Sequence, residues 1–135
     1  MVAGETLCGT VDEAAIGDTL VSLGIGPISR SHSLEMAQLT REYHPAHVMP
    51  RPAGVGGSPG PTLHPLWISS LLDRALAKIC ERSRVIELSV DHRNTPEEGD
   101  SLTLAARLAE RNDESGRIRV RFEVMNQRRK ELARG

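Results

Sequence analysis

Pro65 to Cys80 reads PLWISSLLDRALAKIC, and its apolar residues recur at the spacing of an α-helix. Proline suits the first position of a helix, because that position needs no backbone N–H. The apolar positions cover more than half of the helix circumference, so other elements must wrap this helix. They are Leu66, Trp67, Ile68, Leu71, Leu72, Ala75, Leu76, Ile79 and Cys80.

The segments that follow this helix have the two-residue period of half-buried strands. Apolar residues alternate with outward-facing residues over 86–91, 102–108 and 118–124. A last short strand is expected over 131–134. Turn and connection residues occupy 96–100, 112–116 and 126–129. The sequence therefore predicts an α+β fold. A curved antiparallel sheet wraps one long central helix, in a single domain of residues 1–135.

The front part of the chain predicts a strand, a short helix and a long loop. A strand is expected within 19–28, followed by a helix that starts near Ser31 or Ser33 and ends near Arg41. Pro and Gly are so frequent over 48–62 that no regular element is expected there. Loops of this length inside one domain are usually functional or disordered.

Composition excludes several classes of partner. The net charge is −1 and the basic residues are scattered, so nucleic acid is not an expected partner. No apolar run is long enough to cross a bilayer, and the start of the chain lacks the order of a secretion signal. Cys8 and Cys80 are too few and too far apart for a disulfide framework or a metal site. The sequence predicts a cytoplasmic protein without a membrane partner.

Glu42 to His47 reads EYHPAH and places a carboxylate and an imidazole five positions apart around Pro45. General acid–base catalysis needs one group that holds a water and one that moves a proton. His44 is expected to be extended because it precedes a proline. Glu42 and His47 are therefore the candidate catalytic residues. The alternatives are a merely solvated glutamate and an imidazole held in a structural hydrogen-bond network.

A series of motifs along nearly the whole chain resembles the MaoC-like enoyl hydratases and dehydratases, which have the hot-dog fold. The motifs are Gly17-Asp18-Thr19, Gly26-Pro27-Ile28-Ser29-Arg30, the hexad at 42–47, Pro61-Thr62-Leu63-His64-Pro65-Leu66 and Gly99-Asp100-Ser101-Leu102-Thr103. The resemblance implies a lyase that adds water to, or removes it from, the C2–C3 bond of an acyl thioester on coenzyme A or an acyl carrier protein. It also implies a homodimer or a hot-dog heteromer.

The family motif reads Asp-x-Asn-Pro-x-His, so the resemblance aligns Glu42 and His47 with the catalytic aspartate and histidine. Glu42 is one methylene longer than aspartate, and a shift near 1 Å can cost on the order of 10²-fold in rate. Pro65 replaces a glycine whose N–H polarises the thioester carbonyl, a loss worth about 10²–10³ unless the Leu66 N–H or another group takes over. The expected substrate-binding residues are His44, His64, Leu66 and Trp67.

Neither a cofactor nor a metal is predicted, because the histidines at 44, 47 and 64 lack a metal-binding spacing. Two other functions stay open beside the hydratase. In one, the protein is a biosynthetic cyclase or dehydrating enzyme that acts on a polyketide-like substrate with His47 alone. In the other, it is a non-catalytic acyl-binding hot-dog subunit that supports a catalytic partner.

Overall fold

The computed structural model describes residues 5–7, 11–49, 61–81 and 83–135. Within these ranges six strands form one sheet in the order β1-β2-β4-β5-β6-β3, and every neighbouring pair is antiparallel. The antiparallel sheet predicted from the sequence is confirmed. The strands are β1 Glu5–Leu7, β2 Thr19–Ile25, β3 Asp91–His92, β4 Leu102–Asn112, β5 Arg117–Asn126 and β6 Glu131–Arg134.

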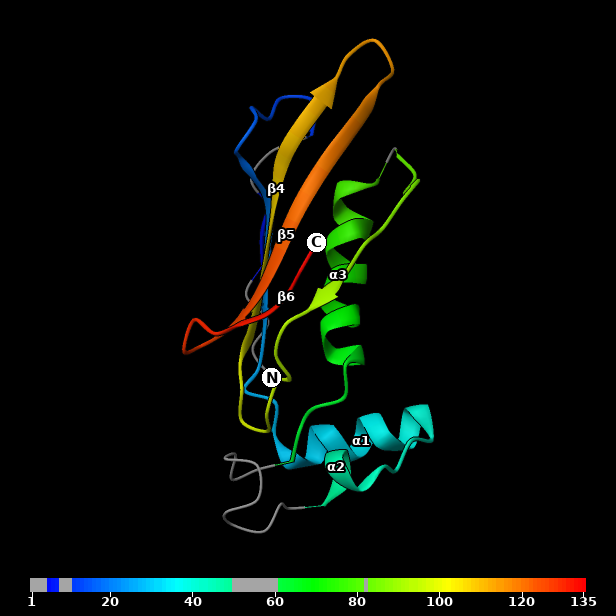
Figure 1. Cartoon of the computed structure of the whole chain (residues 1–135), viewed down its shortest axis with the longest axis vertical. Helices are drawn as coiled ribbons and strands as arrows, with labels where there is room; N and C mark the ends of the chain where they lie inside the picture. The colour runs from blue at the N-terminus through cyan, green and yellow to red at the C-terminus, as the bar shows by residue number, and fades with distance from the viewer. Residues whose placement is uncertain (1–4, 8–10, 50–60, 82) are drawn as a thin grey trace.

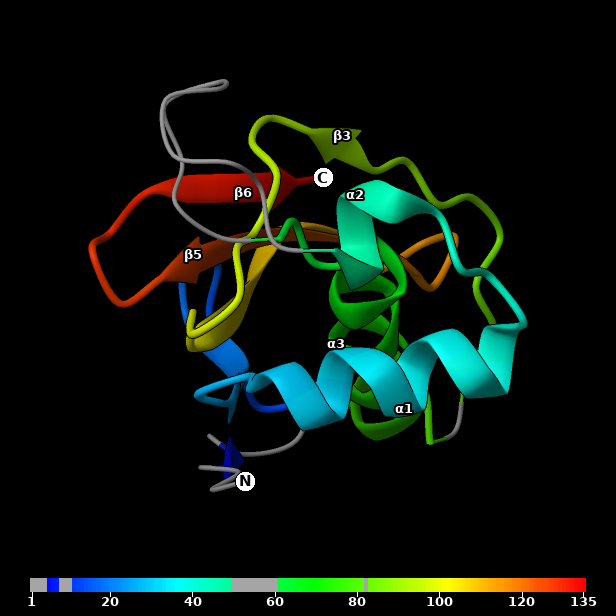
Figure 2. The same cartoon turned by 90° about the horizontal axis from the view of Figure 1, so that it is seen from below.

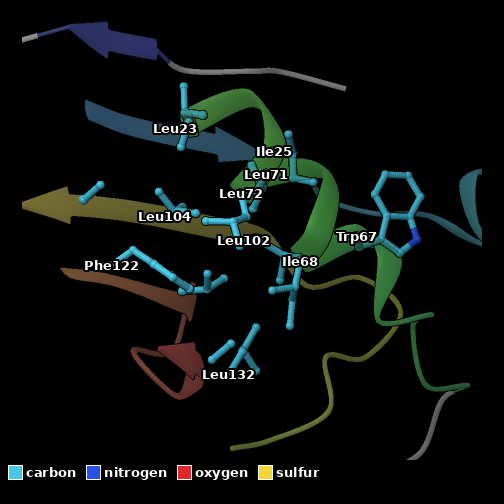
Figure 3. Packing of buried hydrophobic residues seen from close by; sticks show 14 of the residues in the cluster. Leu23, Ile25, Trp67, Ile68, Leu71, Leu72, Leu102, Leu104, Phe122 and Leu132 are labelled. Atoms are coloured by element: carbon cyan, nitrogen blue, oxygen red, sulfur yellow. The ribbon is translucent and has the colours of Figure 1, made fainter. Parts of the chain in front are cut away.

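The central helix, α3, spans Leu66–Ile79 and lies along the concave face of the sheet (Figure 1). Ile68 and Leu71 of this helix belong to one buried cluster with Leu23 of β2 and Leu104 of β4 (Figure 3). The exposed fraction of each of these four residues is 1% or less. The predicted α+β architecture, with one helix inside a curved sheet, is therefore confirmed.

The strand predicted over 86–91 is wrong, because only Asp91–His92 pairs, as β3. Val85, Ile86 and Leu88 are exposed by 46%, 68% and 51%. The outer edge of β5 is paired by β6 only near residues 122–125, and no described residue pairs with the part before it. The alternating pattern identified side chains suited to burial, but no strand within the described residues pairs with most of the segment. Strand β1 was not predicted.

Two helices lie across the N-terminal end of α3 (Figure 2). Helix α1 spans Arg30–Thr40 and is capped by Ser29, not by Ser31 or Ser33, since Ser29 forms a reciprocal capping box with His32. Helix α2 is a single turn, Pro45–Val48, which was not predicted from the sequence. His44 before it is extended, as predicted, with φ −59° and ψ 131°. Most of the predicted loop at 48–62 lies outside the described residues.

A buried carboxylate organises the connection before β4. Asp100 is 2% exposed and accepts hydrogen bonds from the Glu97 N–H at 3.0 Å and from Gln127 Nε2 at 2.9 Å. The loop at 96–100 in turn holds the segment 61–63, because Leu63 N–H donates to the carbonyl of Pro96 at 2.8 Å and Glu98 N–H donates to that of Pro61 at 3.0 Å. This loop therefore ties the end of the sheet to the start of α3.

The outer face of the sheet carries a like-charge pair. Arg107 of β4 lies directly across from Arg121 of β5, and both residues are exposed. Like charges in directly opposite positions destabilise a strand pair. Glu123 relieves part of this repulsion, since one of its carboxylate oxygens lies 4.0 Å from the Arg107 guanidinium.

Candidate active site

Glu42 owes its position to the end of α1. The helix stops at Arg41, whose φ of 57° is left-handed, and the Glu42 N–H then returns to the carbonyl of Ala37 at 3.1 Å. The Glu42 side chain is 51% exposed, and its Oε2 lies 3.4 Å from Nε2 of His64. The turn thus directs the carboxylate toward the segment that opens α3.

His47 is held by the segment 61–63. Its Nδ1 lies 2.8 Å from the backbone carbonyl oxygen of Thr62. A carbonyl oxygen can only accept, so Nδ1 must carry the proton, and Nε2 is left to act on a ligand. Thr62 also fixes the turn that carries His47, because its N–H and its hydroxyl both donate to the carbonyl of Ala46, at 2.9 and 3.1 Å.

His64 links the carboxylate to the start of α3. Its Nδ1 accepts the Leu66 N–H at 3.1 Å, which leaves Nε2 to donate toward Glu42. The pairing of two side chains 22 residues apart in sequence holds Glu42 against the helix start. His64 is therefore a positioning group for Glu42 in this arrangement.

The first backbone N–H groups of α3 all have acceptors. Leu66 N–H donates to the His64 side chain, and Trp67 N–H donates to the His64 carbonyl at 3.1 Å. The N–H groups of Ile68 and Ser69 both donate to the Pro65 carbonyl, at 3.0 and 3.3 Å. The Leu66 N–H, which the sequence suggested as a replacement for the donor missing at Pro65, is therefore already engaged.

A small cavity brings the candidate residues together. Its volume is about 10 Å³, which is on the scale of a single water molecule. Glu42 and His47 both line it, so the carboxylate and the imidazole predicted to share a water border one space. The other lining residues are Ser33, Ala37, His64 and Trp67.

Two of the predicted substrate-binding residues do not line this cavity. His44 is exposed, its Nδ1 accepts the Ala46 N–H at 3.2 Å, and its ring centre lies 5.9 Å from that of His47. Leu66 is 41% exposed. The other two, His64 and Trp67, do line the cavity, and the rings of His47 and His64 are 5.2 Å apart.

Sequence reasoning missed Ser33, Ala37 and Thr62. Ser33 and Ala37 are four residues apart on the inward face of α1 and are both buried. That spacing is a signal that could have found them. Thr62 acts through its backbone carbonyl, which leaves no trace in the sequence. The described residues hold no group of three His, Cys, Asp or Glu side chains placed to bind a metal ion.

Solved structures resemble this chain along nearly its full length. The (R)-hydratase from A. caviae involved in PHA biosynthesis is 15% identical, covers 93% of this chain and 95% of its own, and has a TM-score of 0.72. R-hydratase PhaJ1 from Pseudomonas aeruginosa is 16% identical, with coverages of 99% and 84% and a TM-score of 0.74. The chain has the hot-dog fold.

A third hot-dog structure, the MaoC-like dehydratase from Rhodospirillum rubrum, is 14% identical, with coverages of 94% and 92% and a TM-score of 0.69. The hot-dog fold expected from the resemblance is therefore shown. The sequence matches no protein-family model and no curated protein. Among the described residues, no helix has the length and apolar character needed to span a bilayer.

Proposed function

We propose that this hot-dog protein is an acyl-thioester hydratase or dehydratase whose catalytic pair is Glu42 and His47. One observation carries the proposal: both side chains line the same cavity, which has room on the scale of one water molecule. The similarity to (R)-hydratases and to a MaoC-like dehydratase supports the class of reaction.

In the hydration direction, a water donates one hydrogen bond to the Glu42 carboxylate and one to Nε2 of His47. The pair takes one proton from the water as its oxygen bonds to C3, and the π electrons of the C2–C3 double bond move toward the thioester carbonyl. A proton then returns from the pair to C2, so no net proton is consumed. Dehydration is the reverse sequence.

The surroundings of the pair suit this chemistry. Thr62 fixes the protonated nitrogen of His47, and His64 fixes Glu42, so neither group has to be ordered when the substrate arrives. An acyl thioester is much larger than the cavity. Most of the acyl thioester must therefore lie outside this cavity.

The direct test follows the loss of the conjugated thioester absorbance of a short 2-enoyl-CoA. Glu42→Ala and His47→Ala should each lower kcat/KM by at least about 10²-fold, the usual contribution of a general acid or base. Glu35→Ala on the exposed side of α1 and His92→Ala in β3 are matched controls, and should stay within about 2-fold of the parent because both residues are exposed. Full activity in either site variant would refute the paired mechanism.

The alternatives predict other outcomes of the same assay. Loss of turnover only in His47→Ala favours a diverged enzyme, such as a cyclase or dehydrating enzyme on a polyketide-like substrate. Binding of acyl-CoA without turnover of any chain length favours a non-catalytic subunit that supports a partner. A cytoplasmic location, which an acyl thioester substrate suits, stays a prediction.

We further propose that the protein works as a homodimer, joined through the β5 edge and the segment 85–88. Exposed apolar side chains, and a strand edge that no described residue pairs with, are features that proteins usually cover. Sedimentation velocity should give a dimer, and Ile86→Lys should shift it toward monomer. Leu39→Lys, on an 82% exposed residue of α1, is the control that should not. A monomeric parent would refute the homodimer and leave the heteromer open.

A further inference from the structure

Trp67 carries a hydrogen-bond donor that the described part of the chain does not use. The residue is 9% exposed, and its indole Nε1 is buried. No acceptor for that N–H is found among the residues that the structure describes. A buried donor left without a partner costs about 1–3 kcal/mol, so an orphaned indole N–H calls for a functional explanation.

The position of the indole gives that explanation. Trp67 lines the cavity that Glu42 and His47 share. Unlike Ile68 and Leu71, it is directed away from the strands, and its nitrogen lies on the side of the ring far from the sheet (Figure 3). Trp67 therefore belongs both to the buried hydrophobic cluster and to the residues that line the candidate site, and its unpartnered N–H lies on the side of the ring away from the sheet.

The hydrogen-bonding groups of the residues that line the cavity differ in what they can bind. The Glu42 carboxylate and Nε2 of His47 accept, which suits a water that gives up a proton. The Nε2–H of His64 is directed to Glu42, and the first N–H groups of α3 all have acceptors. The Ser33 hydroxyl donates to the Ser29 carbonyl at 3.3 Å. Among the described residues that line the cavity, Trp67 thus has the side-chain donor for which no acceptor is found, and that donor is left for a ligand oxygen that can only accept.

We propose that the Nε1–H of Trp67 donates a hydrogen bond to the carbonyl oxygen of the acyl thioester. This inference rests on the proposed function. It supplies the donor that Pro65 lacks, from a side chain two residues further along the chain. As water adds to C3, negative charge grows on the thioester oxygen, and the indole N–H stabilises it there.

The test compares two unreactive ligands that differ only at the carbonyl. Calorimetry measures binding of butyryl-CoA, which has the carbonyl oxygen, and of S-butyl-CoA, which has a methylene in its place. The parent should bind the thioester about tenfold more tightly, the upper range for one hydrogen bond. In Trp67→Phe the preference should fall to within about 2-fold. A preference that survives the substitution overturns the inference.

A second variant guards against misfolding, because phenylalanine is smaller than tryptophan. Replacing Trp67 with 3-benzothienylalanine keeps the shape of the indole and removes only the N–H. It should lose the thioester preference as fully as Trp67→Phe, and retention of the preference overturns the inference.

Fluorescence gives an independent readout, because Trp67 is the single tryptophan of the chain. Butyryl-CoA should shift its emission more than S-butyl-CoA does, and equal shifts overturn the inference. If both variants hydrate enoyl-CoA and still prefer the thioester ligand, the role of Trp67 is overturned and the proposed function stands. If neither ligand binds the parent, the result overturns the role of Trp67 and the proposed function together.

Discussion

Asp100→Ala should destabilise the protein strongly although it lies outside the candidate site. The carboxylate is 2% exposed and accepts from the Glu97 N–H at 3.0 Å, from Gln127 Nε2 at 2.9 Å and from Asn126 Nδ2 at 3.4 Å. Gln127 is exposed and can turn to water, but Asn126 is 5% exposed and the Glu97 N–H is partly buried. Two donors at about 1–3 kcal/mol each give an expected loss of about 2–6 kcal/mol.

Urea unfolding at 25 °C, followed by circular dichroism, measures this loss as a lower midpoint with an unchanged slope. Asp100→Asn keeps one acceptor and should lose about half as much. Asp113→Ala, at an exposed turn position, is the control and should change the free energy of unfolding by less than about 0.5 kcal/mol. Hydrogen exchange at Leu63 should quicken in Asp100→Ala, because the loop at 96–100 holds that amide. A loss below about 1 kcal/mol would refute the network.

Three further changes test the core, the sheet face and the helix start. Leu71→Ala removes a fully buried side chain from α3 and should cost about 2–5 kcal/mol in the same urea assay; a cost near zero would mean that the helix is not enclosed. Arg121→Glu replaces the repulsion with Arg107 by attraction and should raise stability by about 0.2–1 kcal/mol at low salt, a gain that high salt should reduce. Pro65→Gly adds an N–H at the start of α3 and should raise kcat/KM for enoyl-CoA hydration by about tenfold; an unchanged rate would mean that the thioester carbonyl does not meet the N–H of residue 65.

Strand patterns in the second half of the chain predicted the sheet well where the partner strand lies in the same chain. The alternation in β4 and β5 gave the correct inward residues, since Leu102, Leu104 and Val124 are fully buried. The same reasoning failed over 86–91. A two-residue period shows which side chains favour burial, but it cannot show whether a neighbouring strand is within reach.

The candidate site could be predicted in part. The spacing of Glu42 and His47 around a proline was enough to suggest a shared water, and both line one cavity. The contact between Glu42 and His64 could not be read from the sequence, because it depends on how the end of α1 meets the start of α3. The engagement of the Leu66 N–H was hidden for the same reason, since it follows from the ring orientation of His64.

The part of the β5 edge that no described residue pairs with bears on how folding depends on protein concentration. If a second chain covers this edge, the folded state contains two molecules while the unfolded state contains one, and mass action then raises the melting temperature as the protein is concentrated. A melting temperature measured at one dilution would in that case describe an association equilibrium together with the fold. Variants of this protein are therefore best compared at matched molar concentrations.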